Sequence, residues 1–260
     1  MNIRLQLFEL EDQPWFPHVI RQGMLDFLRF MISKLDAYEA ALPLLQELLT
    51  KTNQTHITDL CSGAGGGIET IQQDLSQHMG QTIHVTLSDL YPNISAYQYL
   101  KTQSGGTIDF IPEPIDATAV PETINGVRTI FSSFHHFPPT IAQRILQDAA
   151  DKRAAIGIFE GAQKSWVEMI LLWLAFPVVI VLVTPFIRPF KLSRLFFTYI
   201  IPLIPVGIIW DGIVSLLRIY TPAHLQQMLQ TIKAPNYTWQ TGRVGNKPGK
   251  HVIYLIGHPS

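Results

Sequence analysis

The stretch ITDLCSGAGGGIETI, residues 57–71, decides the fold. An apolar run ends at Asp59, and five of the seven residues from 61 to 67 are glycine or alanine. A tight turn from strand to helix needs residues without a Cβ, so that backbone N–H groups can approach a ligand closely. Because a helical pattern, IETIQQDL, comes next, the stretch predicts a strand, a ligand-binding turn and a helix, in that order.

The spacing of the glycines separates the kinds of ligand. A dinucleotide fingerprint, G-x-G-x-x-G, is left incomplete because Ile68 stands at its last position. A phosphate-binding P-loop is excluded because no Lys-Ser or Lys-Thr pair follows the glycines. What remains is the spacing Gly63, Gly65, Gly67, with Asp59 four residues before the first glycine.

From residue 56 onward, short apolar runs alternate with helix-length or turn-rich spacers. This pattern is typical of a doubly wound, mostly parallel α/β sheet. Near the C-terminus, two further runs flank GNKPGK, which predicts an antiparallel hairpin and a sheet of seven strands in all. The runs that we interpret as parallel strands are HITDL, TIHVTLSDL, TIDFI, VRTIFSSF and AAIGIFE.

The N-terminal part has a helical pattern. Residues 18–50 carry apolar residues at spacings of three and four, which predicts a helical cap on the core, with Pro43 opening a second helix. Before it, Trp15 and Phe16 lie between two prolines. We interpret these aromatic residues as core anchors, with part of a lid over a ligand as the alternative.

The segment DLCSGAGGG resembles motif I of the class I S-adenosylmethionine-dependent methyltransferases, in which an acidic residue ends the first strand and G-x-G-x-G follows. Three further features stand in the family's order: an acidic residue at the end of the second strand, an acidic residue with a small neighbour after the third, and the end of the fourth strand. The resemblance therefore covers roughly residues 56–160. It implies S-adenosyl-L-methionine as the cofactor, with the backbone of the glycine turn beneath it. Cys61 and Ser62 are mild departures inside the motif.

The same resemblance implies a role for several side chains. Asp59 would help to hold the methionine amino group, directly or through water. Asp89 would bind the ribose hydroxyls, because a carboxylate can accept from two neighbouring hydroxyls, and Leu90 or Tyr91 would lie against the adenine. The residues assigned to the cofactor in this way are Asp59, Cys61, Ser62, Gly63, Ala64, Gly65, Asp89, Leu90, Asp116, Ala117, Ser132 and Ser133.

Residues after the fourth and fifth strands are the catalytic candidates. Methyl transfer from a sulfonium depends mainly on alignment, and a general base is needed only if the acceptor is protonated. His135 or His136 could take that proton, and Glu160 could orient an acceptor. The alternatives are that one histidine binds backbone or cofactor while the other packs, and that Glu160 caps the next helix. No carboxylate pair or histidine cluster in the sequence indicates a metal site.

The composition limits the function classes. The net charge is -1 and no basic run occurs, so no nucleic-acid partner is expected. The single cysteine rules out an internal disulfide and a cysteine-based zinc site. Charged residues make up only 15% of the chain, against about a quarter in an ordinary soluble protein. The N-terminus carries no apolar core of an export signal.

A long apolar insertion explains the low charge content. From Met169 to Ile187 no residue is charged, which is about the length of a bilayer-spanning helix. A second apolar run, residues 195–210, is broken by Pro202 and Pro205. Three interpretations of these two runs are open: a buried helix pair, a two-pass transmembrane hairpin, and a monotopic hairpin in one leaflet.

The repeated prolines favour the monotopic hairpin, and so do Trp166 and Trp210 at its two ends. The second-ranked interpretation of the insertion is a soluble hydrophobic lid or a dimer face. In the monotopic interpretation, three basic residues between the two runs could meet anionic headgroups. They are Arg188, Lys191 and Arg194.

The sequence therefore predicts a methyltransferase at the cytoplasmic face of a membrane, with an apolar or amphiphilic small-molecule or lipid-like acceptor. Three alternatives are a soluble cytoplasmic small-molecule methyltransferase with a hydrophobic lid, a nucleotide-binding protein on the same fold without methyl transfer, and a non-enzymatic membrane protein. Arg218 is interpreted as a surface or salt-bridge residue, with a headgroup contact as the alternative. The expected parts are a cap (1–55), a methyltransferase core (56–166), the apolar insertion (167–210) and a C-terminal part of the core (211–260).

Overall fold

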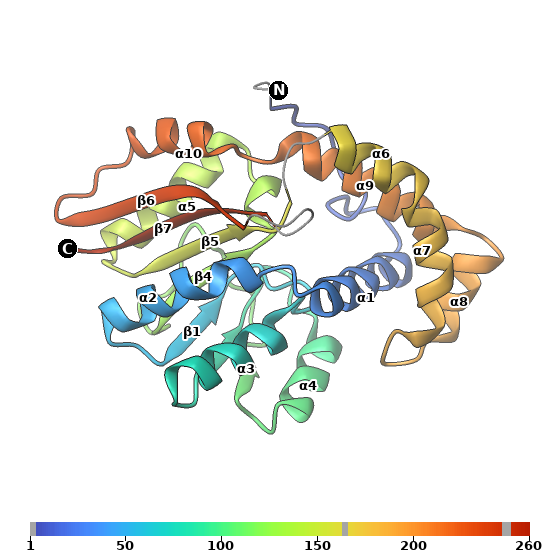
Figure 1. Ribbon diagram of the computed structural model, residues 1–260, viewed down its shortest axis with the longest axis horizontal. Helices are drawn as coiled ribbons and strands as arrows, with labels where there is room; N and C mark the ends of the chain where they lie inside the picture. The colour runs from blue at the N-terminus through green and yellow to red at the C-terminus, as the bar shows by residue number, and fades with distance from the viewer. Residues whose placement is uncertain (1–3, 163–165, 246–250) are drawn as a thin grey trace.

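The computed structural model describes residues 4–162, 166–245 and 251–260. A seven-stranded sheet runs through the larger part of the molecule (Figure 1), in the order β3-β2-β1-β4-β5-β7-β6. The first five strands are parallel, and β7 lies antiparallel between β5 and β6. The strands are β1 (His56–Asp59), β2 (His84–Leu87), β3 (Ile108–Phe110), β4 (Val127–Phe131), β5 (Ile156–Glu160), β6 (Tyr237–Val244) and β7 (Val252–Pro259). The predicted doubly wound sheet with a C-terminal hairpin is confirmed; residues 246–250 of the predicted turn lie outside the described part.

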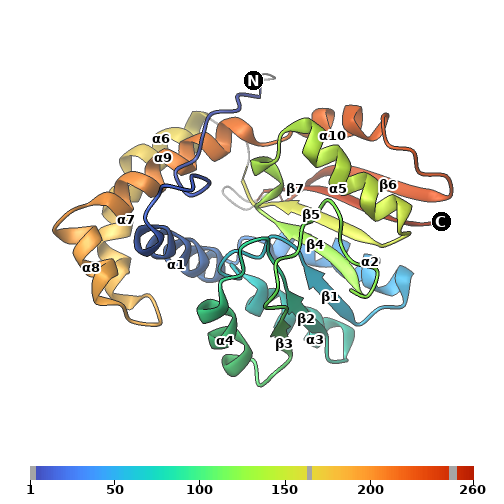
Figure 2. The same cartoon turned by 180° about the vertical axis from the view of Figure 1, so that it is seen from behind.

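Helices cover both faces of the sheet (Figures 1 and 2). On one face, Leu45, Leu75 and Leu100 of three helices pack in one apolar core. On the other face, Leu146 and Leu225 belong to a second core. Strand β5 is buried at every position because it lies between these layers. The helices are α2 (Leu42–Thr52), α3 (Ile68–Met79) and α4 (Ile94–Gln103) on the first face, and α5 (Pro139–Asp151) and α10 (Pro222–Leu229) on the second.

The predicted N-terminal helical cap is confirmed. It consists of α1 (His18–Leu35), the short η1 (Glu39–Ala41) and α2, and Pro43 lies in the first turn of α2 as expected. Of the two aromatic residues before α1, Phe16 is buried but Trp15 is 67% exposed. The interpretation of Trp15 as a core anchor is therefore wrong.

The apolar insertion forms a group of helices beside the sheet, residues 166–218, which we call the helical arm (Figure 1). Its elements are α6 (Trp166–Leu174), α7 (Phe176–Val183), η3 (Thr184–Phe186), α8 (Leu192–Tyr199) and α9 (Leu203–Arg218). The arm packs on α1, since Met24 and Phe27 share a core with Ile180 and Ile208. No single helix among the described residues is long and apolar enough to cross a membrane; α8 and α9 meet that test only together, and the chain bends by 78° between them.

Most large apolar side chains that the described residues expose lie on the helical arm, among them Trp173, Leu182 and Phe186. One of the three basic residues expected to face headgroups does not do so. Arg194 is 2% exposed, and its Nη1 contacts Asp26 Oδ2 of α1 at 2.6 Å. Lys191 reaches the same carboxylate at 2.8 Å. These ion pairs join α8 to α1. The carboxylate that they share, Asp26, is buried.

Candidate active site

The turn between β1 and α3 is the centre of the candidate site. Gly63, Gly65 and Gly67 have φ values of +55°, +72° and +78°, a left-handed backbone that favours glycine. A Cβ at Gly65 would lie 2.4 Å from Leu100 Cδ1, so the buried Leu100 side chain would have to shift. At Gly63 the nearest atom to such a Cβ is 3.9 Å away. The backbone at Gly63 is therefore accessible to a ligand.

Asp89 lies two residues beyond β2 and contacts this turn. The N–H of Gly63 donates to Asp89 Oδ2 at 2.9 Å, and the N–H of Tyr91 donates to Oδ1 at 2.8 Å. The carboxylate is half-buried. Because a carboxylate offers about four acceptor positions, Asp89 can hold the turn and still accept from two neighbouring hydroxyls.

Asp59 ends β1 with its carboxyl group buried. Thr129 Oγ1 donates to its Oδ1 at 2.8 Å. Burial raises the pKa of Asp59 to about 7, because loss of water disfavours the charged form. Hydrogen bonds from Ser62 and Thr129 oppose this shift only in part. A cationic group placed beside Asp59 would favour the ionised carboxylate.

The loop after β3 reaches the same edge. The N–H of Ile115 donates to the backbone oxygen of Asp89 at 2.9 Å. This hydrogen bond brings Asp116 and Ala117 beside the loop that carries Asp89. Asp116 is exposed, Ala117 is buried and Leu90 is 45% exposed. Leu90, predicted to lie against the adenine, therefore lies at the same edge of the site as the predicted cofactor residues Asp116 and Ala117. Within the glycine turn, Ser62 and Ala64 are buried, and burial raises the pKa of the Cys61 thiol, which stays protonated.

The chain after β4 forms the opposite side of the site. Ser132 has a left-handed φ of 44°, and its hydroxyl accepts from Tyr38 Oη at 2.7 Å and from the Gly161 N–H at 3.1 Å. Ser133 Oγ donates to the backbone oxygen of Cys61 at 3.2 Å. The two serines thus join the β4 turn to the cap, to β5 and to the glycine turn.

His135 and Glu160 form a buried pair. His135 lies in η2 (Phe134–His136), and its N–H donates to Glu160 Oε1 at 3.0 Å. Its Nδ1 hydrogen-bonds Glu160 Oε2 at 2.8 Å. Glu160 therefore orients the histidine ring. The Nε2 of His135 makes no hydrogen bond with any described residue.

His136 forms ion pairs with carboxylates of the N-terminal segment. Its Nδ1 hydrogen-bonds Asp12 Oδ1 at 2.9 Å and lies 3.0 Å from Glu9 Oε2. Burial alone would lower the pKa of His136, but Asp12 and Glu9 outweigh it and raise the pKa to about 10. Burial likewise opposes ionisation of Asp12, yet hydrogen bonds from His136 and Arg218 lower its pKa to about 2. The predicted salt-bridge role of Arg218 is confirmed, although the side chain is buried rather than on the surface.

These contacts come from an N-terminal segment, residues 4–16, that sequence reasoning did not place in the site. Asp211 accepts from the N–H groups of Leu10 and Glu11 at 2.6 and 3.0 Å. Arg4 Nη2 donates to the backbone oxygen of His135 at 2.8 Å. The unusual EDQPWFP stretch was the one available signal, but its carboxylates rather than its aromatic residues meet the site.

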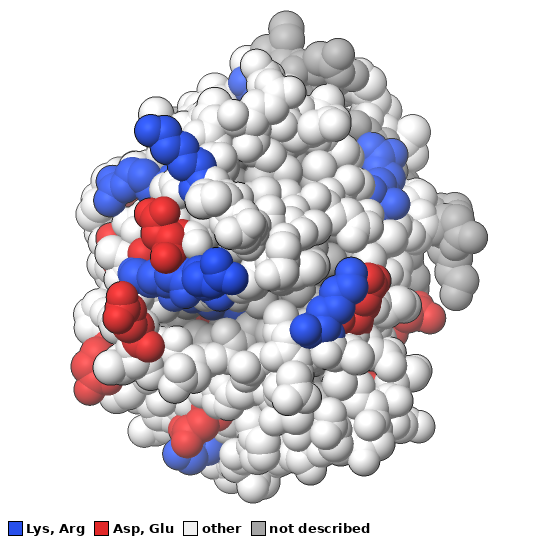
Figure 3. Space-filling model, turned by 90° about the vertical axis from the view of Figure 1, so that its left-hand side faces the viewer, with Lys and Arg blue, Asp and Glu red and all other residues white. Residues whose placement is uncertain are grey.

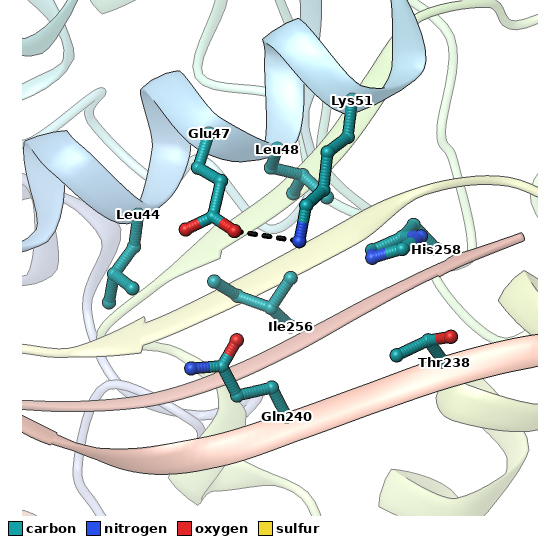
Figure 4. Close-up of a pocket in the computed structure, with 8 residues that line it drawn as sticks. All are labelled: Leu44, Glu47, Leu48, Lys51, Thr238, Gln240, Ile256 and His258. Carbon is teal, nitrogen blue, oxygen red and sulfur yellow. Dashed lines mark ion pairs between the residues drawn. The ribbon is translucent and has the colours of Figure 1, made fainter. Parts of the chain in front are cut away.

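A small hollow elsewhere in the molecule is not this site. It lies between α2 and the C-terminal hairpin, where Glu47 and Lys51 form an ion pair (Figure 4). Ile256 in its wall pairs with Gly157, near the start of β5. Ligands of open α/β sheets bind beyond the carboxyl ends of the strands. The glycine turn, Asp89, Asp116 and the residues after β4 lie at that end, and the hollow does not.

Comparison with known proteins identifies the fold. No family model and no curated protein matches the sequence. Among solved structures, the methyltransferase domain of a bacterial Hen1 protein is similar, with 12% identity and a TM-score of 0.50, over 85% of this chain and 99% of that one. A candidate O-methyltransferase from Nostoc punctiforme is similar at 12% identity and a TM-score of 0.50, over 95% of this chain and 61% of that one. The chain therefore has a Rossmann-like methyltransferase fold.

Proposed function

We propose that this protein transfers a methyl group from S-adenosyl-L-methionine to an apolar or amphiphilic acceptor that reaches it from a membrane. The fold and the cluster of glycine turn and acidic residues at the carboxyl edge support the cofactor. In this proposal Asp59 faces the methionine amino group and Asp89 the ribose hydroxyls. Leu90 and Asp116 lie along the adenine, and Ser132 and Ser133 lie near the methyl group.

The position of α1 carries the acceptor part of the proposal. On one side, Ile32 contacts the glycine turn, since a Cβ on Gly67 would lie 2.7 Å from Ile32 Cγ2. On the other side, Met24 and Phe27 pack in the core of the helical arm. One helix thus separates the proposed cofactor site from an exposed apolar surface. An acceptor taken up along the arm would arrive beside the methyl donor without passing through water.

The arm fits attachment to one leaflet. The arm carries most of the large apolar side chains that the described residues expose, and large exposed apolar patches mark interaction sites. The opposite end of the molecule carries interleaved side chains of both signs, without a broad area of one sign on the face in view (Figure 3). We propose the cytoplasmic side of a membrane as the location. A soluble enzyme with a hydrophobic lid is the second candidate, since the arm packs on α1, whose Ile32 contacts the glycine turn.

We propose that the catalytic candidates form the polar side of the site at the carboxyl edge of the sheet. Glu160 orients His135 through Nδ1, which leaves Nε2 as the atom that could take a proton or bind a cation. His136 is held by Asp12. Because alignment supplies most of the acceleration in methyl transfer, the proposal does not depend on a base.

Transfer of radioactive methyl from S-adenosylmethionine tests the proposal. The detergent-purified protein is incubated with a total membrane lipid extract, and label is counted in the organic phase. We expect label in the organic phase with the wild type and at least about tenfold less with Asp89→Ala, which loses a charged hydrogen-bond acceptor. Label that enters only water-soluble acceptors would contradict the apolar acceptor. No transfer by a protein that binds S-adenosylhomocysteine would contradict this acceptor class as a whole.

A further inference from the structure

A cluster of histidine and carboxylate ligands lies where the N-terminal segment crosses η2. Glu9, His135 and His136 each place one ligand atom within 4.8 Å of the other two. Their sequence separation conceals the cluster, because Glu9 comes from the N-terminal segment and the histidines from the turn after β4. We propose that these three residues bind a divalent transition-metal ion. The inference does not depend on methyl transfer.

The first argument is that ligand atoms in the cluster are buried without hydrogen bonds. Among the described residues, His135 Nε2 and Glu11 Oε2 find no hydrogen-bond partner, and Glu9 Oε2 has only an ion-pair contact with His136 Nδ1 at 3.0 Å. Glu9 is fully buried and His135 is 4% exposed. A buried polar atom that makes no hydrogen bond costs free energy. A cation bound between the Nε2 lone pair and the carboxylate would satisfy both.

The second argument is the orientation of His135. Metal-binding histidines almost always donate the other ring N–H to a carboxylate or a carbonyl, which fixes the tautomer and the ring plane. Glu160 Oε2 lies 2.8 Å from Nδ1 and performs this role. With the proton on Nδ1, Nε2 carries the lone pair, and Glu9 Oε1 lies 3.9 Å from this nitrogen.

The third argument concerns charge. Arg218 Nη1 lies 3.0 Å from Glu9 Oε1, so it occupies one oxygen of that carboxylate and leaves Oε2 for a metal. His136 Nδ1 is already 3.0 Å from Oε2 and would give up its proton to the solvent when the ion binds. Five carboxyl groups lie in the surroundings, against three cationic groups, which are two guanidinium groups and the His136 imidazolium. The carboxyl groups are Glu9, Glu11, Asp12, Glu160 and Asp211, and the guanidinium groups are Arg4 and Arg218.

The donor set indicates the kind of ion. Two imidazoles and one carboxylate suit Zn²⁺, with metal–ligand distances of about 2.0–2.2 Å. Donors of a tetrahedral ion then lie about 3.4 Å apart. The cluster would contract by small side-chain rotations, and the fourth position could take water or Asp12. The ion would join the N-terminal segment to the turn after β4.

Metal titration of the full chain tests the inference. Protein in detergent is stripped with a chelator, dialysed and titrated with Zn²⁺ by calorimetry and with Co²⁺ by visible absorption. We expect one equivalent of either ion and a rise in melting temperature with Zn²⁺, because the ligands come together only in the folded chain. Glu9→Gln and His136→Gln should each weaken binding at least about tenfold. His78→Gln, at an exposed histidine on α3, is the matched control and should bind as the wild type does.

Two results would overturn the inference. One is a folded wild type that takes up no stoichiometric Zn²⁺ and shows no change in melting temperature. The other is equal affinity in the wild type, Glu9→Gln and His136→Gln, which would place the ion elsewhere. Because the wild-type titration stands alone, poor folding of a variant does not remove the test. Loss of metal binding would leave the proposed cofactor site untouched, so the two proposals fail separately.

Discussion

At the scale of single residues, Asp59 shows how position changes chemistry. It ends a strand of an otherwise apolar core, and burial raises the pKa of its carboxyl group to about 7. The sequence predicts its place, because a strand followed by glycines ends there. The sequence does not predict the shift, which depends on Thr129 of the neighbouring strand and on helices that pack over both.

The raised pKa of Asp59 predicts a pH dependence of cofactor binding. If Asp59 faces the methionine ammonium, only its ionised form binds well, and that form is lost as the pH falls below about 7. Proton competition then predicts an affinity for S-adenosylhomocysteine about tenfold lower at pH 6 than at pH 8. Calorimetry at both pH values measures this, and Asp59→Asn should bind weakly and equally at both. A wild-type affinity without pH dependence would contradict the assignment.

The histidine pair illustrates what sequence reasoning cannot reach. His135 and His136 were recognised as site candidates because they follow the fourth strand. Their hydrogen-bond partners differ, because one ring bonds Glu160 and the other bonds Asp12, although both rings lie near Glu9. Asp12 is 124 residues away in the chain, and no periodicity connects it to the turn after β4.

At the scale of elements, the glycine turn and the parallel strands were predictable because both depend on local sequence. Short apolar runs between helical spacers give the strands, and residues without Cβ give the turn. The helical arm was harder to predict. Its apolar run at residues 169–187 has the length of one helix, yet the chain breaks into α6, α7 and η3. Pro177 and Pro185 lie in the first turns of the later two, where proline is tolerated.

Gly65 provides a prediction about the turn. Gly65→Ala should lower the free energy of unfolding by about 2–5 kcal/mol, because it combines a left-handed φ with a contact to Leu100. Gly80→Ala is the matched control, since Gly80 has a φ of +63° and no atom within 4 Å of a new Cβ. It should cost about 1 kcal/mol. Thermal unfolding compares the two, and equal melting temperatures would mean that the turn is not tightly packed.

The attachment of α8 to α1 provides a prediction about the stability of the protein. Asp26→Ala removes the carboxylate that pairs with buried Arg194 and should destabilise the protein by about 3–5 kcal/mol. Asp109→Ala removes an ion pair with Lys101 whose side chains are about half exposed, and should cost at most about 1 kcal/mol. Denaturant unfolding in detergent measures both. Similar losses for the two variants would show that the buried pair does not hold the arm.

At the scale of the whole molecule, the arrangement places a polar sheet domain at one end and an apolar helical arm at the other. Composition alone indicated the arm, because a low charge content must leave apolar surface somewhere. It did not indicate that α1 would lie between the arm and the glycine turn. That placement results from packing between residues 20–27 and residues 180–208.

Membrane attachment should depend on the exposed face of the arm. Trp173→Ser with Phe186→Ser removes two large apolar side chains, each worth about 1.5–3 kcal/mol when fully buried. We expect at least tenfold weaker association with phosphatidylglycerol-containing vesicles in a flotation assay. The matched control is Leu35→Ser with Tyr91→Ser, two exposed residues outside the arm, at 55% and 83% against 64% for Trp173 and 69% for Phe186. Equal flotation of both double variants, or no flotation of the wild type, would contradict membrane attachment through the arm. Either result would favour the alternative of a soluble enzyme with a hydrophobic lid.

The most direct test of the account is calorimetric titration of the purified wild type with S-adenosylhomocysteine. The account predicts saturable binding at one site, weakened at least about tenfold in Asp89→Ala and unchanged in Glu113→Ala, at an exposed carboxylate near Asp116. No binding by the folded wild type would contradict the assignment of the glycine turn to this cofactor.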